Sequence, residues 1–524
     1  MMKRLIAIGL AAAALLGANG HSLASDLARG PIVALPDGKV EGIATNGVQS
    51  FLGIPFARPP IGSLRWRPPE AIARWTEVKP ATRTHIGCVA PESGDGPASN
   101  EEDCLYLNVY RPEGIKPGER LPVMLFLHGG GNVWGAPAIY DGERMALAAR
   151  AVVVIPAYRL GAFGFLSLPA GVEGDTALQD QLAALRWVHS NATALGGSPT
   201  RVTLAGESAG AADVCALLAA PSAKGLFSAA IMQSGFCTNT PNRQEAEAIG
   251  RAVAAKAGCA DASLPCLQAL PADRIMAAWG AVWGGGATPL FPMTPSGSAA
   301  LPMAPMDAFR AGSQAKVPVL VGFDRDELRS FLWQDFPLAK DRFDAIVLRA
   351  YRGDAKAVAS EYPLTNGEDP LYTLGAIRSD QMIICPSLTV AGALSHHVPV
   401  STFEFADRTA PPFRGLAARH PVPEGFNAGA SHTSELRYLF GYQAVARDLS
   451  PNQARLADDM TRLWVAFGRT SSASRWAPFT AALRRTTVFA LPAAGGIDVQ
   501  ADVYNRHHCA FWVTHPIAVT SLLP

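Results

Sequence analysis

The chain has 524 residues, of which 49% are hydrophobic and 17% are charged, and its formal net charge is +1 at pH 7. A near-neutral chain without a basic stripe argues against nucleic acid and anionic membrane surfaces as partners. The high apolar content excludes a disordered chain, so the 49 glycines and 41 prolines indicate many loops between many packed elements.

The N-terminus is predicted to be a secretory signal peptide of residues 1–24. A basic start, Met1–Arg4, precedes the apolar run Leu5–Gly17 and a small-residue site that ends at Ala24. The run is too short to span a bilayer as a permanent helix. We therefore expect an exported protein, periplasmic or secreted, without a permanent membrane anchor. No repeat or linker divides the mature chain, so residues 25–524 are expected to form one domain.

Beyond this segment, the apolar pattern alternates between strands and helices. Strands are predicted at Leu105–Tyr110, Leu121–Leu127, Val152–Ala157, Val202–Ala205, Ala229–Gln233, Val317–Gly322, Val398–Phe405 and, as an edge strand, Thr487–Leu491. Helices are predicted at Thr176–Leu195, Ala211–Ala220, Arg243–Ala257, Phe343–Ser360 and Pro451–Phe467. This order predicts an α/β fold with a mostly parallel sheet that helices cover on both faces.

A serine lies between two glycines where a predicted strand turns into a predicted helix. The stretch Gly206-Glu207-Ser208-Ala209-Gly210 follows Val202–Ala205 and precedes Ala211–Ala220. A sharp turn here strains the backbone of Ser208 and leaves no room for side chains at positions 206 and 210, which glycine lacks. The pattern is that of a nucleophile elbow, which presents a serine hydroxyl at the carboxyl end of a sheet strand.

An elbow serine needs a base and an acid that orients the base. His432 lies in a loop of small residues downstream of the elbow and is the candidate base. Asp324, Asp326 and Glu327 follow the predicted strand Val317–Gly322. Any of the three acids could lie at the same sheet edge as the elbow and orient His432.

Donors for an oxyanion are predicted after another buried strand. The glycine run Gly129–Gly131 follows Leu121–Leu127. Such a run allows backbone N–H groups to turn toward one point, where the N–H of Ala209 joins them. Loss of one donor of this kind typically costs about 2.7–4 kcal/mol of transition-state stabilisation.

These motifs, with several others, resemble the type-B carboxylesterases, the family of α/β-hydrolases that includes the cholinesterases. The resemblance runs from about Gly30 to Trp512. Its carriers, in family order, are FLGIPFA (51–57), EDCLYLNV (102–109), HGGG (128–131), YRLGAFGF (158–165), DQLAALRWV (180–188), GESAG (206–210), QSG (233–235) and HCAFW (508–512). The resemblance implies the α/β-hydrolase fold and hydrolysis of small-molecule esters without a cofactor.

The resemblance also implies a role for each site residue. These are the nucleophile Ser208, the general base His432, the orienting acid Glu327, and the oxyanion donors Gly130, Gly131 and Ala209. The family register favours Glu327 over its neighbours Asp324 and Asp326.

The chain has eight cysteines, which in an exported protein predict disulfides. The resemblance implies the pairs Cys88–Cys104, Cys259–Cys266 and Cys385–Cys509. Cys215, on the helix behind the serine, and Cys237, just after the motif QSG, are predicted to form a fourth pair, with two buried thiols as the alternative. No Cys/His spacing is that of a zinc site, so no metal is expected; His507-His508-Cys509 is the nearest.

The chain departs from the family pattern at several positions. Asn132 stands where the family usually has an aromatic residue, Asp213 where serine is frequent, and Leu195 where phenylalanine is common. Asn132 is expected to alter the pocket beside the oxyanion donors. The loop between Cys88 and Cys104 lacks the tryptophan with which cholinesterases bind a quaternary ammonium, so choline esters are not the expected substrates.

Aromatic residues are plentiful in the segments that flank the gorge of this family. They are Trp134, Trp279, Trp283, Phe291, Phe331 and Trp333. As a group they favour an apolar pocket for the acyl or the alcohol part of an ester.

The expected function is an exported serine carboxylesterase that forms an acyl-enzyme. The alternatives are a lipase, an amidase or a hydrolase of bulky esters (polyester, toxin or xenobiotic) on the same triad, and a non-catalytic binding protein of the same fold. The motifs do not separate these substrates and leave the oligomeric state open.

Overall fold

In the computed structural model of the chain, the described residues are 30–92, 98–169, 171–283, 291–411, 422–442, 449–468 and 476–516. The predicted signal peptide, residues 1–24, lies outside them. Within the described ranges, no helix is both long enough and apolar enough to cross a membrane.

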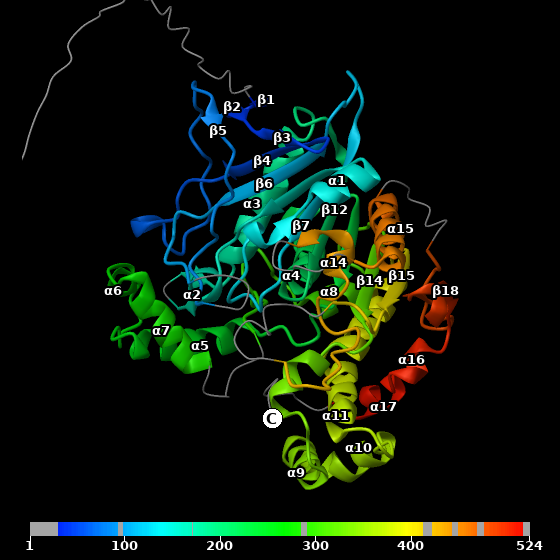
Figure 1. The fold of residues 1–524 in the computed structure, drawn as a ribbon. Coiled ribbons are helices and arrows are strands. Elements are labelled where there is room, and N and C mark those ends of the chain that lie inside the picture. Colours follow the sequence, from blue (N-terminus) through cyan, green and yellow to red (C-terminus); the bar gives the residue numbers. More distant parts are fainter. Residues whose placement is uncertain are drawn as a thin grey trace, which may run out of the picture.

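The centre of the fold is a mixed sheet to which the described residues contribute eleven strands (Figure 1). In spatial order these are β18 (Ile497–Gln500), β17 (Thr486–Phe489), β15 (Val400–Phe405), β14 (Val319–Asp324), β13 (Ala229–Gln233), β12 (Gly197–Glu207), β7 (Leu121–Leu127), β9 (Val152–Pro156), β6 (Tyr106–Pro112), β4 (Val48–Pro55) and β3 (Ile43–Thr45). From β17 to β9 all neighbours are parallel. The carboxyl ends of these strands therefore meet at one edge.

Side chains of β7 alternate between two hydrophobic cores, one on each face of the sheet, and this is why the strand is apolar throughout. One core contains Val123 and Leu125 with α3 (Thr176–Asn191), α4 (Ala209–Ala219), α8 (Pro305–Arg310) and α12 (Cys385–Ser395). The other contains Met124 and Phe126 with α1 (Glu143–Ala149), α14 (Leu436–Leu439) and α15 (Pro451–Phe467). Helices thus cover both faces, as predicted.

A third core lies beside the sheet and is formed by α2 (Gly161–Phe165), α5 (Arg243–Lys256), α6 (Leu264–Gln268) and α7 (Ala272–Trp283), drawn together in Figure 1. The other described helices are α9 (Lys340–Tyr351), α10 (Ala355–Glu361), α11 (Pro370–Ser379), α16 (Val503–Arg506) and α17 (Cys509–Thr514). Short strands also lie at β1 (Ile32–Leu35), β2 (Gly38–Glu41), β5 (Lys79–Pro80), β8 (Tyr140–Asp141), β10 (Ser167–Leu168), β11 (Val172–Glu173) and β16 (Gly441–Tyr442).

Two predicted elements differ from the structure. The helix expected over Phe343–Ser360 is broken into α9 and α10, because Arg352 adopts a left-handed conformation with φ of 44° and a short 3₁₀ turn follows. The predicted edge strand, β17, is not at the edge. The chain turns back at Gly495 and Gly496, and β18 pairs antiparallel with β17 on its outer side.

The eight cysteines form four disulfides in the structure, Cys88–Cys104, Cys215–Cys237, Cys259–Cys266 and Cys385–Cys509. The last joins the start of α12 to the start of α17, which are 124 residues apart. Cross-links over so long a loop stabilise a fold chiefly by restricting the unfolded chain.

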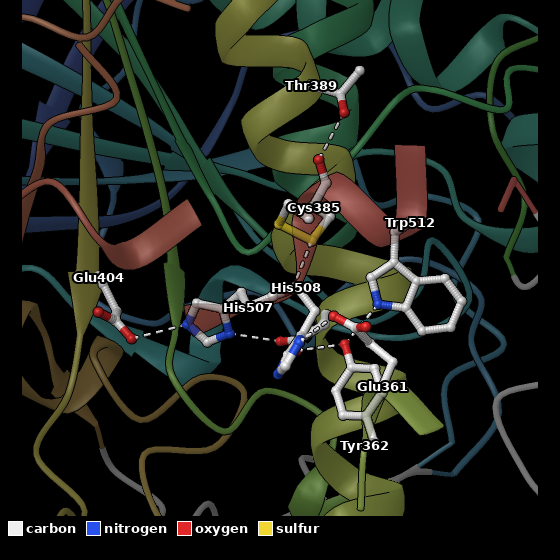
Figure 2. The surroundings of a disulfide bond; sticks show 10 residues. Glu361, Tyr362, Cys385, Thr389, Glu404, His507, His508 and Trp512 are labelled. Carbon is white, nitrogen blue, oxygen red and sulfur yellow. Dashed lines mark hydrogen bonds and ion pairs between the residues drawn. A yellow bond between two sulfur atoms is a disulfide. The ribbon is translucent and has the colours of Figure 1, made fainter. Parts of the chain in front are cut away.

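A buried charge network lies beside this last disulfide (Figure 2). His507 Nδ1 lies 2.6 Å from Asp380 Oδ1, and His507 Nε2 lies 3.1 Å from Glu404 Oε1. Burial alone lowers the pKa of His507, but the two carboxylates outweigh it and raise the pKa to about 9. An imidazolium held between two carboxylates therefore fastens the C-terminal helices to β15.

Replacing His507 with leucine is expected to lower the free energy of unfolding by about 3–5 kcal/mol, because the buried carboxylate of Asp380 loses its cation, whereas Glu404 keeps Arg325 and Arg506. Since the pKa of His507 is raised when folded, its contribution is complete below about pH 6.5 and declines as the pH rises through about 9. Urea unfolding of the disulfide-bonded protein at about pH 6 and about pH 10 measures this.

The matched control is His508→Gln, which removes the neighbouring, partly exposed imidazole that pairs with Glu361. This variant is expected to lose less than about 1 kcal/mol, as partly exposed pairs do. Equal losses in the two variants, or a loss at position 507 that grows with pH, would contradict the charge network.

Candidate active site

Ser208 occupies the turn between β12 and α4, at the carboxyl edge of the sheet. Its φ is 56° and its ψ is −123°, an unfavourable conformation for a residue with a side chain. The flanking glycines admit the turn: a Cβ at Gly206 would lie 2.4 Å from the carbonyl oxygen of Gly210, and a Cβ at Gly210 would lie 2.2 Å from that of Leu127. The Ser208 N–H donates to the carbonyl of Gln233 on β13, which ties the turn to the next strand.

His432 and Glu327 meet Ser208 from distant parts of the chain. His432 Nε2 lies 2.9 Å from Ser208 Oγ, and His432 Nδ1 lies 2.6 Å from Glu327 Oε2. The backbone N–H of His432 also donates to the carbonyl of Glu327, so the two loops are held together twice. Glu327 is completely buried, and His432 is 8% exposed. The arrangement can pass a proton from the serine to the imidazole while the carboxylate orients the ring.

The other two acids of the 324–327 segment contact different partners. Asp326 pairs with Arg329 and Arg408 and accepts a hydrogen bond from the N–H of Ala430. Asp326 therefore anchors the loop that carries His432 without touching the ring.

Asp324 faces Glu435 in a completely buried pair of carboxyl groups. Burial and the neighbouring Glu435 and Glu327 hold the pKa of Asp324 well above its ordinary value. Asp324 and Glu435 share a hydrogen bond, and Asp324 Oδ2 accepts from the N–H of Ser434 at 3.0 Å. The Asp324 N–H also donates to Glu327 Oε1 at 2.9 Å, which orients the carboxylate beside His432.

A fourth carboxylate, Glu207, was not anticipated from the sequence. Its Oε1 lies 3.3 Å from His432 Nε2, on the side of the ring that faces Ser208. Burial lowers the pKa of His432, but Glu207 and Glu327, with the hydrogen bond to Glu327, outweigh burial and raise it to about 9. Its position before the serine in GESAG is the only sequence signal that pointed to it.

The glycine loop after β7 lies against this site. Gly130 and Gly131 have φ of 110° and 61°, and a Cβ at Gly130 would lie 2.1 Å from the carbonyl oxygen of Trp134. We find no hydrogen bond from the N–H groups of Gly130, Gly131 or Ala209 to another residue in the described part of the chain. Three such groups can donate hydrogen bonds to the oxyanion of a tetrahedral intermediate.

The aromatic residues expected around the site divide into two groups. Trp134 and Phe291 lie over Gly131, and the ring of Phe331 lies 5.7 Å from that of His432. Trp279 and Trp283 instead stack on each other within the third core, and Trp333 is buried. The site also has an aromatic residue that the sequence analysis missed, Phe236, whose ring packs edge-on against Phe291 at 5.4 Å.

Comparisons with known proteins identify a family for the chain. A family model described as "Carboxylesterase family" matches residues 29–512. The chain is 32% identical to the para-nitrobenzyl esterase of Bacillus subtilis (strain 168), over 87% of this chain and 94% of that protein. It is 33% identical to the human cocaine esterase, over 81% and 80%, and 31% identical to the fumonisin B1 esterase of Sphingopyxis macrogoltabida, over 82% and 80%.

Solved structures give the same result for the fold. A structure titled "PNB esterase" superimposes with a TM-score of 0.76 at 31% identity and covers 91% of this chain and 98% of its own. A structure titled "thermophylic PNB esterase" superimposes with a TM-score of 0.77 at 30% identity, over 91% and 99%. The sheet and its flanking helices are those of an α/β-hydrolase.

Proposed function

The chain belongs to the carboxylesterase family of carboxylic-ester hydrolases, and from that premise we propose that it is an exported serine esterase with Ser208, His432 and Glu327 as its triad. The observation that carries this proposal is the pair of short contacts at His432, 2.9 Å to Ser208 Oγ and 2.6 Å to Glu327 Oε2. Four disulfides are typical of oxidising compartments and support export.

In the proposed mechanism His432 takes the proton of Ser208 Oγ as the oxygen attacks the ester carbonyl. The N–H groups of Gly130, Gly131 and Ala209 stabilise the oxyanion that forms. His432 then gives its proton to the leaving alcohol, and the acyl group stays on Ser208. A water molecule, deprotonated by His432, releases the acid and regenerates the serine.

The buried carboxylate of Glu327 fixes the tautomer and the orientation of the His432 ring. Glu327 accepts from Nδ1–H, which leaves Nε2 to accept the serine proton and stabilises the imidazolium that follows. The Asp324 N–H donates to the Glu327 carboxylate and fixes its position. The Glu327 carbonyl accepts from the N–H of His432, which holds the two loops together. The Phe236–Phe291 pair and Phe331 offer apolar walls, so we propose small uncharged esters as substrates.

A burst assay tests the proposal directly. The protein without residues 1–24 is mixed with p-nitrophenyl esters from acetate to palmitate. We expect a burst of about one p-nitrophenol per protein, followed by slower turnover, because acylation precedes deacylation. The chain length with the highest kcat/KM measures the pocket, and a preference for long chains at an interface would instead indicate a lipase. No turnover of any ester by the folded protein would favour the binding-protein alternative.

The rate is expected to rise with pH up to about 9. His432 accepts the serine proton only when neutral, and its carboxylate neighbours raise its pKa to about 9, so the neutral fraction falls at lower pH. The measurement is kcat/KM for p-nitrophenyl butyrate between about pH 5 and pH 10, corrected for uncatalysed hydrolysis. A rate independent of pH between about 5 and 8 would contradict the role of His432.

Glu207→Gln is expected to shift the rise of kcat/KM with pH to lower pH, because the charge of Glu207 has the largest coulombic effect among those that raise the pKa of His432. Glu435→Gln is the matched control, since Glu435 is also buried near the ring but acts on it more weakly. Equal shifts in the two variants would contradict the assignment to Glu207.

A further inference from the structure

Two residues that depart from the family pattern contact each other beside the site. Asn132 follows Gly131 in the glycine loop, and Asp213 lies on α4 behind Ser208. Asn132 Nδ2 donates to Asp213 Oδ1 at 3.2 Å. Asn132 is completely buried and Asp213 is 3% exposed. Two unusual residues, 81 positions apart and buried against each other, point to one joint role.

The side-chain amide of Asn132 joins three segments of the chain. Its Nδ2 also donates to the carbonyl of Pro292 at 2.9 Å, so both N–H groups of the amide have partners. Its own backbone carbonyl accepts from the N–H of Gly161 at the start of α2. The amide therefore links the oxyanion loop to the nucleophile helix and to the backbone at Pro292, next to Phe291.

Asp213 is anchored on its other side. Gln181 Nε2, from α3, donates to Asp213 Oδ2 at 2.6 Å. Burial raises the pKa of Asp213 to about 7, against the hydrogen bonds from Gln181 and Asn132, which favour the charged form. The carboxyl group of Asp213 thus lies between two side-chain amides that donate to it, and these contacts fix the direction of the Asn132 side chain.

The residue next to Pro292 is a wall of the site. A Cβ at Gly131 would lie 3.9 Å from Phe291 Cβ, and the Phe291 ring packs edge-on against Phe236. Phe331 lies on the other side, against His432. An acyl group on Ser208 Oγ would have its carbonyl oxygen at the oxyanion loop, so we expect its chain to lie near Phe291, which stands beside Gly131.

We propose that Asn132 and Asp213 form a positioning pair that holds the Phe291 wall against the oxyanion loop and so sets the size of acyl group that the site accepts. The inference rests on the proposed esterase function. Neither residue touches the reacting atoms. Asn132 acts through the carbonyl of Pro292, and Asp213 acts through Asn132.

The test compares two substrate series in variants of the pair. Asn132→Gly removes the amide but tolerates the φ of 55° at this position, so backbone strain is not introduced. Asp213→Leu removes the acceptor and places a larger apolar side chain there. Both variants are expected to raise the ratio of kcat/KM for p-nitrophenyl octanoate to that for the acetate by about tenfold, mainly through KM. A series of acetate esters with alcohols of increasing size is expected to keep its wild-type ratios.

Asp213→Asn is the matched variant. An asparagine oxygen can accept from Asn132, and Gln181 can reverse its amide to accept from the new N–H, because Gln181 Oε1 has no hydrogen-bond partner among the described residues. This variant is expected to stay within about threefold of the wild-type acyl ratio.

The outcomes distinguish a failure of the positioning pair from a failure of the esterase function. Unchanged acyl ratios in variants that still turn over esters would overturn the role of the pair and leave the esterase proposal intact. Equal changes in the acyl and alcohol series, or Asp213→Asn behaving like Asp213→Leu, would also overturn it, because a general loosening of the fold has that effect. No ester turnover by the unaltered protein would overturn both proposals.

Discussion

Replacing Ser208 with alanine is expected to lower kcat for p-nitrophenyl esters by about 10⁶-fold and to abolish the burst. Without the hydroxyl no acyl-enzyme can form, and His432 has no nucleophile to deprotonate. The residual rate then comes only from the oxyanion donors and substrate binding. The measurement is pre-steady-state and steady-state hydrolysis of p-nitrophenyl butyrate by the wild-type and variant proteins.

Ser234→Ala is the matched control for this change. Ser234 is buried, follows the neighbouring strand β13 and has a φ of 53°, close to the 56° of Ser208. Its backbone N–H donates to the carbonyl of Gly322, a bond that alanine keeps. We expect the control to retain kcat within about threefold, as for a change that leaves the machinery in place. A Ser208→Ala protein that keeps its burst would contradict the proposed nucleophile.

Replacing Glu327 with glutamine is expected to lower kcat by about 10⁴-fold, the effect of the equivalent change in serine proteases. The glutamine amide would donate to His432 Nδ1 and leave the proton on Nε2. The ring then cannot accept the proton of Ser208, although the fold and the volume of the side chain are preserved. Steady-state rates at about pH 8 measure this loss, and circular dichroism checks the fold.

Asp324→Asn is the matched control. It removes a different buried carboxyl group, three residues before Glu327, and so tests whether the loss is specific to Glu327. Asp324 shares a hydrogen bond with Glu435, and an asparagine can donate to Glu435 and accept from the N–H of Ser434 in its place. We expect kcat to change by less than about fivefold, as for a substitution that keeps its hydrogen bonds. A loss as large as that of Glu327→Gln would contradict the assignment of the orienting acid.

Much of the fold could be predicted because its elements carry local patterns. The run at β7 is apolar at every position since its two faces enter two cores, and α15 begins where Ser450 and Gln453 form a capping box. The pattern failed where a local signal was misleading. The helix expected over Phe343–Ser360 is broken into α9 and α10 at Arg352, whose φ is 44°.

Some features of the candidate site were also predictable from local sequence, and others were not. The strand–Gly–Ser–Gly–helix order predicted the strained turn at Ser208, because steric exclusion acts between residues a few positions apart. The residues alone left three acids as partners for His432, of which the family resemblance favoured Glu327, and the contact of Glu207 with the ring was not anticipated.

The sequence by itself thus determined eight of the eleven strands that the described residues contribute to the sheet, the elbow and the chemical types of residue at the sheet edge, all of which depend on near neighbours. Only the tertiary structure decided which groups touch: Glu327 with His432 across 105 positions, His432 with Ser208 across 224, and Asn132 with Asp213 across 81. These contacts follow from the order of parallel strands in the sheet. Hydrophobic periodicity specifies which face of a strand is buried, but not which strands become neighbours.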